Sequence, residues 1–350
     1  MKAVVKTQSG KGFLEFQDVP EPEPTGFEMK VKVHYAPICG SDLGVWNGFE
    51  PVPWGWPCVV GHEFSGTIES MGPLAKGFEI GDRVVARTLK DFCGHCHSCL
   101  QGRPDKCPNG RHSIGFNTNG TLTDYVLIDS RMAFKLPDHI DMLAASAIEP
   151  TAATVRAVFE IARVKAGDTV AIMGAGSIGL MVLQGVKACG AKAILIDLSS
   201  AAHNLEVGKE LGADYIIEND KCNSIKEVRQ LTKGVGVDIG FECAGHASTI
   251  SQLLLMIKSS GSMVEVAVPT EEGGPKISTY SLACMQEIQI LSAFDAHMST
   301  WIKTMELVSD GVIDPGVLMS KVYPLDQFFE VLENKDPTVI KPVFSPLLKE

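Results

Sequence analysis

The sequence lacks any apolar run long enough to span a bilayer, and its first residues, MKAVVKTQSGKG, have no long apolar core of the signal-peptide kind. It also lacks an excess of positive charge, because 31 Lys and Arg face 42 Asp and Glu, for a net charge of −11. An acidic chain repels phosphate backbones and anionic lipid head groups. These absences argue against nucleic acids and membranes as partners, and they predict a cytoplasmic protein.

Low-complexity tracts, linkers rich in Pro, Gly or Ser, and repeats beyond a β–α alternation are missing as well. The composition is that of an ordinary globular protein, with 45% hydrophobic and 21% charged residues. A chain of 350 residues is too long to fold around a single hydrophobic core, so its length predicts two domains. Because no linker separates them, only a change of pattern marks the boundary.

That change of pattern comes near residue 150. Before it, short β-branched segments separated by Gly, Pro or Asn predict a β-rich half, for example at residues 29–35, 64–70, 81–87 and 123–129. From Asp168 onward, strand patterns such as TVAIM and AILID alternate with apolar helix patterns, which predicts βαβ units around a parallel sheet. After residue 285 the pattern blurs into the strand-like EIQIL and two amphipathic helices, in STWIKTMELVSDG and LDQFFEVLENK.

A dense group of thiols lies in the segment CGHCHSCLQGRPDKC, which holds Cys93, Cys96, Cys99 and Cys107. Two C-x-x-C steps and a wider third gap predict a tetrahedral zinc site with zinc–sulfur bonds of about 2.3 Å. Four thiolates leave no coordination position for water, so this ion would be structural. The alternatives are an iron–sulfur cluster, a zinc-ribbon nucleic-acid module and four unrelated thiols. The spacing, the polar surroundings and the acidity of the chain favour structural zinc.

A second set of candidate ligands is dispersed along the chain. Cys39 lies in CGSD, His62 and Glu63 lie in GHEFSG, and Glu149 lies in IEP. A thiolate, an imidazole and carboxylates make a mixed set typical of zinc sites that keep one position open. Singly, each has a simpler explanation: Cys39 as a small buried residue, His62 as a core histidine, Glu149 as a cap or ion-pair partner. Spacing alone does not bring them together.

A glycine-rich loop follows the strand pattern TVAIM and precedes a helix pattern. It reads G-x-G-x-x-G, with glycines at Gly174, Gly176 and Gly179. Ser177 and Ile178 lie between the last two glycines. In this context the loop is typical of a dinucleotide site, where amides at the helix N-terminus face the pyrophosphate. Asp197 ends the next strand, where a carboxylate accepts hydrogen bonds from the adenosine ribose and repels a 2′-phosphate. No arginine follows closely, which predicts NAD over NADP.

The order of these motifs, from CGSD through GHEFSG, GDRV, the four cysteines, NGTLTDYVLI, IEP and GAGSIG to ILID, resembles the zinc-dependent medium-chain dehydrogenase/reductase superfamily over essentially the whole chain. The resemblance implies an α/β protein with a GroES-like β-rich catalytic domain, from residues 1–150 and 290–350, that carries a structural zinc lobe at 90–110. It implies a doubly wound Rossmann NAD-binding domain at 151–289. Reversible hydride transfer between an alcohol and NAD, two zinc ions per chain, and a homodimer or homotetramer are also implied.

Within the superfamily, GHEFSG and IEP are most similar to polyol, butanediol and threonine dehydrogenases, and CPNGRHSIGFNTNGTLTDYVL is similar to sugar-alcohol and sugar-alcohol-phosphate dehydrogenases. This likeness implies a catalytic zinc on Cys39, His62 and Glu63, with Glu149 approaching directly or through water. It favours a polyol, sugar or sugar-alcohol substrate. The alternatives are 2,3-butanediol, threonine or a polyol phosphate, and a non-catalytic NAD-responsive binding protein.

Two residues depart from the family pattern. Many members carry a histidine in a proton relay where this chain has Gly44, while Ser41 matches the relay hydroxyl. Some polyol dehydrogenases carry an arginine where LSAFDAH offers Asp295, which argues against phosphorylated substrates. An aromatic group between the first two ligand motifs either packs a loop or lines a substrate pocket; it comprises Trp46, Phe49, Trp54 and Trp56.

Overall fold

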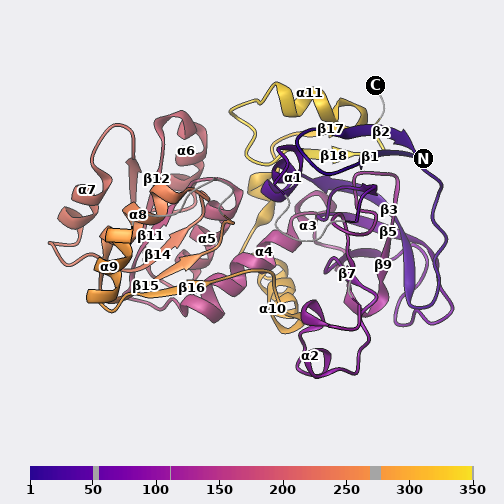
Figure 1. Cartoon of the computed structure of the whole chain (residues 1–350), viewed down its shortest axis with the longest axis horizontal. Helices are drawn as coiled ribbons and strands as arrows, with labels where there is room; N and C mark the ends of the chain where they lie inside the picture. The colour runs from indigo at the N-terminus through magenta and orange to yellow at the C-terminus, as the bar shows by residue number, and fades with distance from the viewer. Residues whose placement is uncertain (50–54, 111, 269–276, 349–350) are drawn as a thin grey trace. The chain divides into compact units, whose positions relative to one another are not determined.

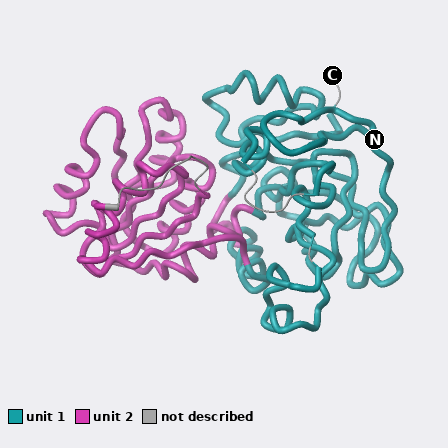
Figure 2. Tube along the Cα trace, viewed as in Figure 1, with its two compact units in different colours: residues 1–149, 297–309, 315–350 teal, residues 150–296, 310–314 magenta. Residues whose placement is uncertain are grey.

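The computed structural model describes residues 1–49, 55–110, 112–268 and 277–348, and it divides the chain into two compact units (Figure 2). Unit 1 comprises residues 1–149, 297–309 and 315–350, and unit 2 comprises residues 150–296 and 310–314. Unit 2 is therefore inserted into the sequence of unit 1. The expected boundary at 289/290 falls inside a strand of unit 2, β16 (Gln289–Ser292), so the return to unit 1 comes later than the sequence suggested.

Unit 1 is built from short, mostly antiparallel strands (Figure 1). Three strands form a small sheet in the order β2-β1-β4, with bounds Leu14–Asp18, Lys2–Lys6 and Cys58–Val59. The larger sheet follows the path β10-β6-β5-β3-β18-β17, with bounds Ala133–Lys135, Arg83–Ala86, Ser65–Met71, Glu28–Pro37, Val343–Ser345 and Val322–Pro324. Strand β9 (Tyr125–Asp129) also pairs with β3, while β7 (Leu89–Lys90) and β8 (His112–Ser113) form a separate ribbon.

Strand β3 shows why this half folds as a sheet. Met29, Val31 and Val33 alternate along it and are fully buried in the core of unit 1. Alternation at period two is the pattern of a strand that presents one face to a core. The α-helices described in unit 1 are α1 (Gly40–Trp46), α2 (His97–Leu100), α3 (Met142–Ala145), α10 (Met298–Ser309) and α11 (Phe328–Glu333), of which only α10 exceeds two turns. Helix α4 (Ile148–Val155) contains the change from unit 1 to unit 2.

Unit 2 contains a six-stranded parallel sheet in the order β13-β12-β11-β14-β15-β16 (Figure 1). The strands not yet bounded are β11 (Thr169–Met173), β12 (Lys192–Asp197), β13 (Tyr215–Glu218), β14 (Val237–Glu242) and β15 (Ile257–Glu265). The connecting helices are α5 (Ser177–Ala188), α6 (Ala202–Glu210), α7 (Ser224–Leu231), α8 (Ala247–Met256) and α9 (Ile277–Met285), preceded by a π-helix at Arg156–Ala162. The order reverses between β11 and β14, which is where a doubly wound sheet binds its ligand.

Helices cover both faces of this sheet. Ile194 and Ile196 of β12 belong to a core that includes Ile250 of α8. Leu195 lies between them and points to the other face, where a Cβ added to Gly208 of α6 would lie 2.2 Å from its Cδ2. Strands buried on both faces account for the continuous apolar runs in this half of the sequence. Among the described residues, no helix is both long and apolar enough to cross a membrane.

Candidate metal and cofactor sites

The four-cysteine segment folds into a lobe in which the thiols converge. The Sγ atom of Cys93 lies 3.6 Å from that of Cys107 and 4.0 Å from that of Cys99, and Cys96 Sγ lies 3.9 Å from Cys107 Sγ. A tetrahedron with zinc–sulfur bonds of about 2.3 Å has edges of about 3.8 Å, so the spacing fits this ion. The backbone N–H of His95 and the amide of Asn109 lower the pKa of the Cys93 thiol to about 5, whereas burial and the neighbouring thiols raise the pKa of Cys99 to about 12, so in the absence of a metal only part of the group favours the thiolate. These four cysteines form a structural zinc site.

A buried aspartate anchors this lobe to the rest of unit 1. The carboxylate of Asp105 accepts from Arg87 Nη2 at 3.1 Å and from Arg103 Nη2 at 2.8 Å. Burial raises the pKa of Asp105, but the hydrogen bonds and charges of the two arginines outweigh burial and hold this pKa well below its usual range. Arg87 follows β6, so the contact ties the lobe to the large sheet.

The second site is formed by Cys39, His62 and Glu63, whose ligand atoms all lie within 4.8 Å of one another. Cys39 precedes α1, and the other two lie in the turn between β4 and β5. This turn requires Gly61, because its φ is +89° and a Cβ there would lie 2.7 Å from Thr121 Oγ1. One thiolate, one imidazole and one carboxylate provide three ligands and leave a fourth position open, as in a catalytic zinc site.

Asp42 orients two of these ligands, and sequence reasoning missed it. Its Oδ2 accepts the backbone N–H of Cys39 at 2.9 Å, and its Oδ1 lies 3.4 Å from His62 Nδ1. Burial lowers the pKa of His62, but Asp42 and Cys39 outweigh it and hold this pKa well above the ordinary value. Once the ring is neutral, a proton on Nδ1 would face Asp42 and leave the Nε2 lone pair for a metal. One signal in the sequence could have identified Asp42: it is an acidic residue three positions after Cys39, the residue that caps α1.

Lys341 was also missed. Its Nζ lies 2.7 Å from Glu63 Oε2, donates to Glu63 Oε1 at 3.0 Å and donates to the carbonyl of Ile38 at 3.1 Å. Both side chains are buried, with exposed fractions of 2% for Lys341 and 0% for Glu63. Burial lowers the pKa of Lys341, but the carboxylate of Glu63 outweighs it and raises the pKa. The ion pair compensates Glu63 in the core.

Ser41 lies beside this cluster, in the first turn of α1. Its Oγ is buried and has no hydrogen-bond partner among the residues that the structure describes. A buried hydroxyl without a partner is unusual in a folded protein and marks a place where a ligand atom fits. Gly44 is buried in the same helix, and a Cβ there would lie 3.5 Å from Phe49 Cδ1, so Phe49 occupies the adjacent space. The role of Ser41 in a proton relay stays a prediction.

The other predicted residues near this site are placed as follows. Glu149 lies in the first turn of α4 and is not part of the group formed by the three ligands, so its role as a fourth ligand stays a prediction. Trp46 and Trp56 pack against the core of unit 1, which favours loop packing over a pocket wall. Trp54 lies outside the described residues.

The glycine loop adopts the conformation that the dinucleotide motif requires. Gly174 has a φ of +102°, and its N–H donates to the carbonyl of Ile196 at 2.8 Å. Gly176 precedes the first residue of α5, Ser177, and the loop therefore presents backbone amides at a helix N-terminus. A Cβ on Gly179 would lie 1.8 Å from the carbonyl oxygen of Gly174, so only glycine fits there.

Asp197 ends β12 next to this loop. Its Oδ2 accepts from the backbone N–H of Ala175 at 2.6 Å, and its Oδ1 accepts from that of Leu198 at 2.7 Å. A second carboxylate lies near: Asp220 accepts from the backbone N–H of Ser199 at 2.7 Å and from its hydroxyl at 2.6 Å. The region expected to receive the adenosine ribose is therefore acidic.

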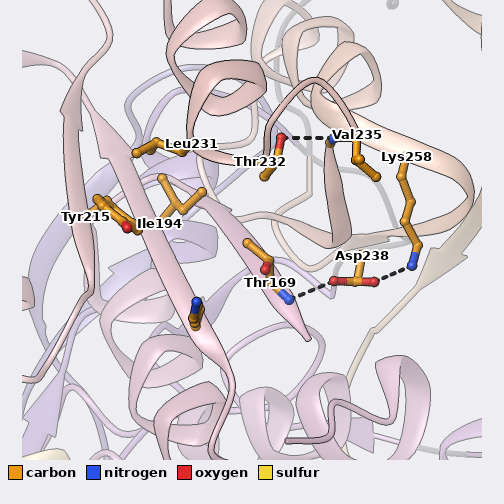
Figure 3. Close-up of a pocket in the computed structure, with 10 residues that line it drawn as sticks. Thr169, Ile194, Tyr215, Leu231, Thr232, Val235, Asp238 and Lys258 are labelled. Carbon is orange, nitrogen blue, oxygen red and sulfur yellow. Dashed lines mark hydrogen bonds and ion pairs between the residues drawn. The ribbon is translucent and has the colours of Figure 1, made fainter. Parts of the chain in front are cut away.

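A hollow of about 230 Å³ lies elsewhere in unit 2 (Figure 3). Its lining includes Thr169, Lys192, Tyr215, Asp238 and Lys258, which all lie at or near the first residues of their strands. The carboxylate of Asp238 is bound by Lys258 and by the backbone N–H of Thr169. The hollow is therefore at the amino ends of the parallel strands, opposite the edge that carries the glycine loop, and it is not the dinucleotide site.

Two family models match the chain. The model for the alcohol dehydrogenase GroES-like domain matches residues 25–138, and the model for zinc-binding dehydrogenase matches residues 177–310. The first covers all three ligands of the open site, and the second begins within the glycine loop. Both halves of the predicted architecture, the GroES-like domain and the Rossmann domain, are thus confirmed.

Individual proteins are similar over nearly the full length. D-arabitol-phosphate dehydrogenase of Enterococcus avium is 32% identical over 95% of this chain and 94% of its own length. Sorbitol dehydrogenase of Halalkalibacterium halodurans is 30% identical over 99% of this chain and 100% of its own. The structure of a zinc-binding dehydrogenase from Sinorhizobium meliloti with NADP has a TM-score of 0.88 at 28% identity, covering 99% of both chains.

Proposed function

The chain belongs to the zinc-dependent, NAD(P)-linked medium-chain alcohol dehydrogenases, and from this membership we propose that it reversibly oxidises a secondary hydroxyl of a polyol, sugar or sugar alcohol with NAD. The observation that carries the proposal is the convergence of Cys39, His62 and Glu63 in a three-ligand group. The similarity to arabitol-phosphate and sorbitol dehydrogenases supports the substrate class.

Each residue of the group has a chemical task. A zinc ion held by Cys39, His62 and Glu63 would supply a Lewis acid with an open position, which acidifies an alcohol. Ser41 would relay the alcohol proton, accepting it while its own hydroxyl proton passes outward to the cofactor ribose and water; its buried hydroxyl has no partner among the described residues. Asp42 keeps the His62 ring in one orientation, and Lys341 pairs with the buried carboxylate of Glu63 in the core. The glycine loop and Asp197 bind the dinucleotide.

The preference for NAD rests on two carboxylates. Asp197 ends the strand after the glycine loop, and Asp220 holds Ser199 in the segment that follows. A 2′-phosphate placed there meets negative charge, and no lysine or arginine occurs in LSSAA, the five residues after Asp197. We expect Asp197→Ser to raise the KM for NAD and to narrow the preference for NAD over NADP by about tenfold or more. An unchanged ratio of kcat/KM for the two cofactors contradicts the proposal.

An unphosphorylated substrate is favoured over a phosphorylated one. Asp295 stands where some polyol dehydrogenases carry an arginine, and Arg156 donates to the backbone carbonyls of Phe294 and Asp295 at 2.7 and 3.2 Å. A carboxylate near the substrate repels a phosphate group. Threonine and 2,3-butanediol remain the alternative substrates.

A substrate panel tests the proposal. Sorbitol, xylitol, arabitol, arabitol phosphate, 2,3-butanediol and threonine are each assayed for NADH formation, before and after removal of exchangeable metal. We expect the free polyols to give the highest kcat/KM and chelation to abolish turnover. A preference for threonine or for 2,3-butanediol contradicts the substrate class but leaves the enzyme class in place.

Substitution of one ligand tests the site itself. Cys39→Ser should lose turnover by about 10³-fold or more while retaining NADH binding, because the hydroxyl is a poor zinc ligand. Cys284→Ser is the matched control, since this exposed thiol lies outside the ligand groups. Normal turnover of the Cys39 variant would falsify the assignment of the open site.

A homodimer or homotetramer stays a prediction, as does the cytoplasmic location. Support for self-association comes from β16, which lies at the end of the described strand order and carries Ile290 at 40% exposure. Met285 and Phe294 nearby in sequence are 76% and 66% exposed. An edge strand with exposed apolar side chains is a template for pairing. We expect light scattering to give a molar mass that is a multiple of 37.6 kDa, and we expect Ile290→Lys to lower this molar mass.

A further inference from the structure

The carboxyl edge of the sheet in unit 2 is lined with acids. Four strands end in one: β12 in Asp197, β13 in Glu218, β14 in Glu242 and β15 in Glu265. Asp197 was assigned above to the ribose. Glu242 is the one fully buried member of this row, with an exposed fraction of 0%. Burying a carboxylate costs free energy unless it is compensated, so its contacts indicate what it does.

The side chain of Glu242 accepts hydrogen bonds from the turn that joins β14 to α8 and from Thr249 in the first turn of α8. Its Oε1 accepts the backbone N–H groups of Ala244 and Gly245, each at 3.1 Å, and the hydroxyl of Thr249 at 2.7 Å. Its Oε2 accepts the N–H of Gly245 at 3.0 Å. Burial raises the pKa of Glu242 above its ordinary value, and these donors oppose burial by favouring the ionised form without outweighing it.

This turn is the counterpart of the glycine loop in the other half of the sheet. In both halves a strand runs into a short turn and then a helix, α5 in one case and α8 in the other. Amides at such a turn attract an anion. In the first half the cofactor pyrophosphate is the expected anion, whereas in the second half the chain provides its own, the carboxylate of Glu242. The second turn is therefore already filled and stiffened before any ligand binds.

The two turns also touch. A Cβ on Gly174 would lie 3.0 Å from both the nitrogen of Ala244 and the carbonyl carbon of Cys243. The N–H of Cys243 donates to the carbonyl of Met173 at 2.8 Å, directly before the glycine loop. The backbone carbonyl of Glu242 accepts from the N–H groups of residues 266 and 267, at 3.0 and 3.1 Å. The turn thus connects the carboxyl ends of β11 and β15.

From these contacts we propose that Glu242 is a positioning residue for the dinucleotide. As an internal anion it fixes the turn at residues 243–245, and this turn supports Gly174, so the glycine loop presents its amides in a single conformation. The proposal rests on dinucleotide binding and not on the identity of the alcohol. Loss of the support should appear in cofactor affinity, with little change in turnover once the cofactor saturates.

Glu242→Gln is the main variant, because the side chain keeps its size but offers one acceptor oxygen where two are used. Thr249→Val removes a single donor to the same carboxylate and leaves the backbone donors. Glu210→Gln is the matched control, an exposed glutamate at the end of α6 in the same unit. The dissociation constant for NADH is measured by fluorescence well below the melting temperature, together with KM and kcat for NAD, zinc content and the melting temperature.

We expect the NADH dissociation constant to rise about tenfold in Glu242→Gln and about threefold in Thr249→Val, with kcat at saturating NAD within about twofold of wild type. Zinc content and the control should be unchanged. A fall in melting temperature with an unaltered dissociation constant overturns the proposal, since Glu242 then only stabilises the fold. A lower kcat with unaltered NADH binding also overturns it. If Glu242→Gln does not fold, Thr249→Val provides the test, and an unaltered NADH dissociation constant in that variant overturns the proposal.

Discussion

Replacing Lys341 with Met is the most direct test of how the open site is stabilised. The substitution keeps an unbranched four-atom stem and removes the ammonium group, which takes the ion-pair partner away from the fully buried carboxylate of Glu63. Breaking a buried ion pair from one side costs about 3–5 kcal/mol, because an uncompensated charge stays in the core. The carbonyl of Ile38 also loses its donor. We therefore expect the free energy of unfolding of metal-free unit 1 to fall by about 4 kcal/mol.

Tryptophan fluorescence isolates unit 1 in this experiment, because all four tryptophans belong to it, at positions 46, 54, 56 and 301. With a urea dependence of about 2 kcal/mol per molar, the midpoint should fall by about 2 M. The measurement is made at pH 8, after removal of the exchangeable metal and with the four-cysteine ion verified by metal analysis. Lys2→Met is the control, since it removes an ion pair with Asp18 whose side chains are 69% and 73% exposed.

Metal loading provides the second half of the test. A divalent cation bound by Cys39, His62 and Glu63 compensates the carboxylate, so the deficit of Lys341→Met should shrink when the site is loaded. A midpoint within about 0.5 M of wild type in the metal-free state refutes the reasoning, because Glu63 then does not depend on Lys341. An equal deficit with and without metal shows that Glu63 is not one of the ligands.

Three further outcomes follow from the described contacts. Cys96→Ser should remove one of two zinc equivalents and lower the melting temperature more than it lowers kcat, because a closed site contributes folding energy; metal analysis and calorimetry check this. Asp105→Asn should destabilise the lobe by about 3 kcal/mol, since it removes the carboxylate that the buried guanidinium of Arg87 contacts at 3.1 Å. Because the pKa of Asp105 is lowered on folding, its contribution is present above about pH 5 and is lost as the pH falls below the ordinary carboxyl value, so acid titration of the wild type and variant should converge. Gly179→Ala should abolish NADH binding measured by fluorescence, since its Cβ collides with the carbonyl of Gly174, and a bound, unperturbed cofactor contradicts the loop assignment.

The parts of the site that were predictable from sequence are those encoded locally. The four-cysteine lobe and the glycine loop each lie within one short segment, so spacing alone specifies their geometry. The open site is different, since Cys39 and His62 come together only through the pairing of the strands around them. The spacing of these residues does not predict that they converge. The convergence was predicted only from the order of the motifs, which resembles that of the dehydrogenase superfamily.

Lys341 shows what local patterns cannot reveal. It is 278 residues from Glu63 in the sequence, and KPVF carries no mark that distinguishes a buried lysine from an exposed one. The expected boundary at 289/290 differs from the division into compact units for a related reason. EIQIL was correctly predicted to be strand-like, but nothing in it states that β16 pairs with β15 and so belongs to unit 2. Both depend on long-range contacts.

The position of Lys341 also has a consequence for biosynthesis. Residues 341–345 clamp the segment before Cys39: the N–H of Ile38 donates to the carbonyl of Pro342 at 3.0 Å, and β18 pairs with β3. A ribosome must therefore synthesise more than 340 residues before the first ligand segment gains its final neighbours. The four-cysteine lobe carries its ligands within residues 93–107 and has no such dependence. Metal uptake by the nascent chain should consequently be ordered, with the sulfur-only ion incorporated before the open site has gained its contacts with Lys341 and β18.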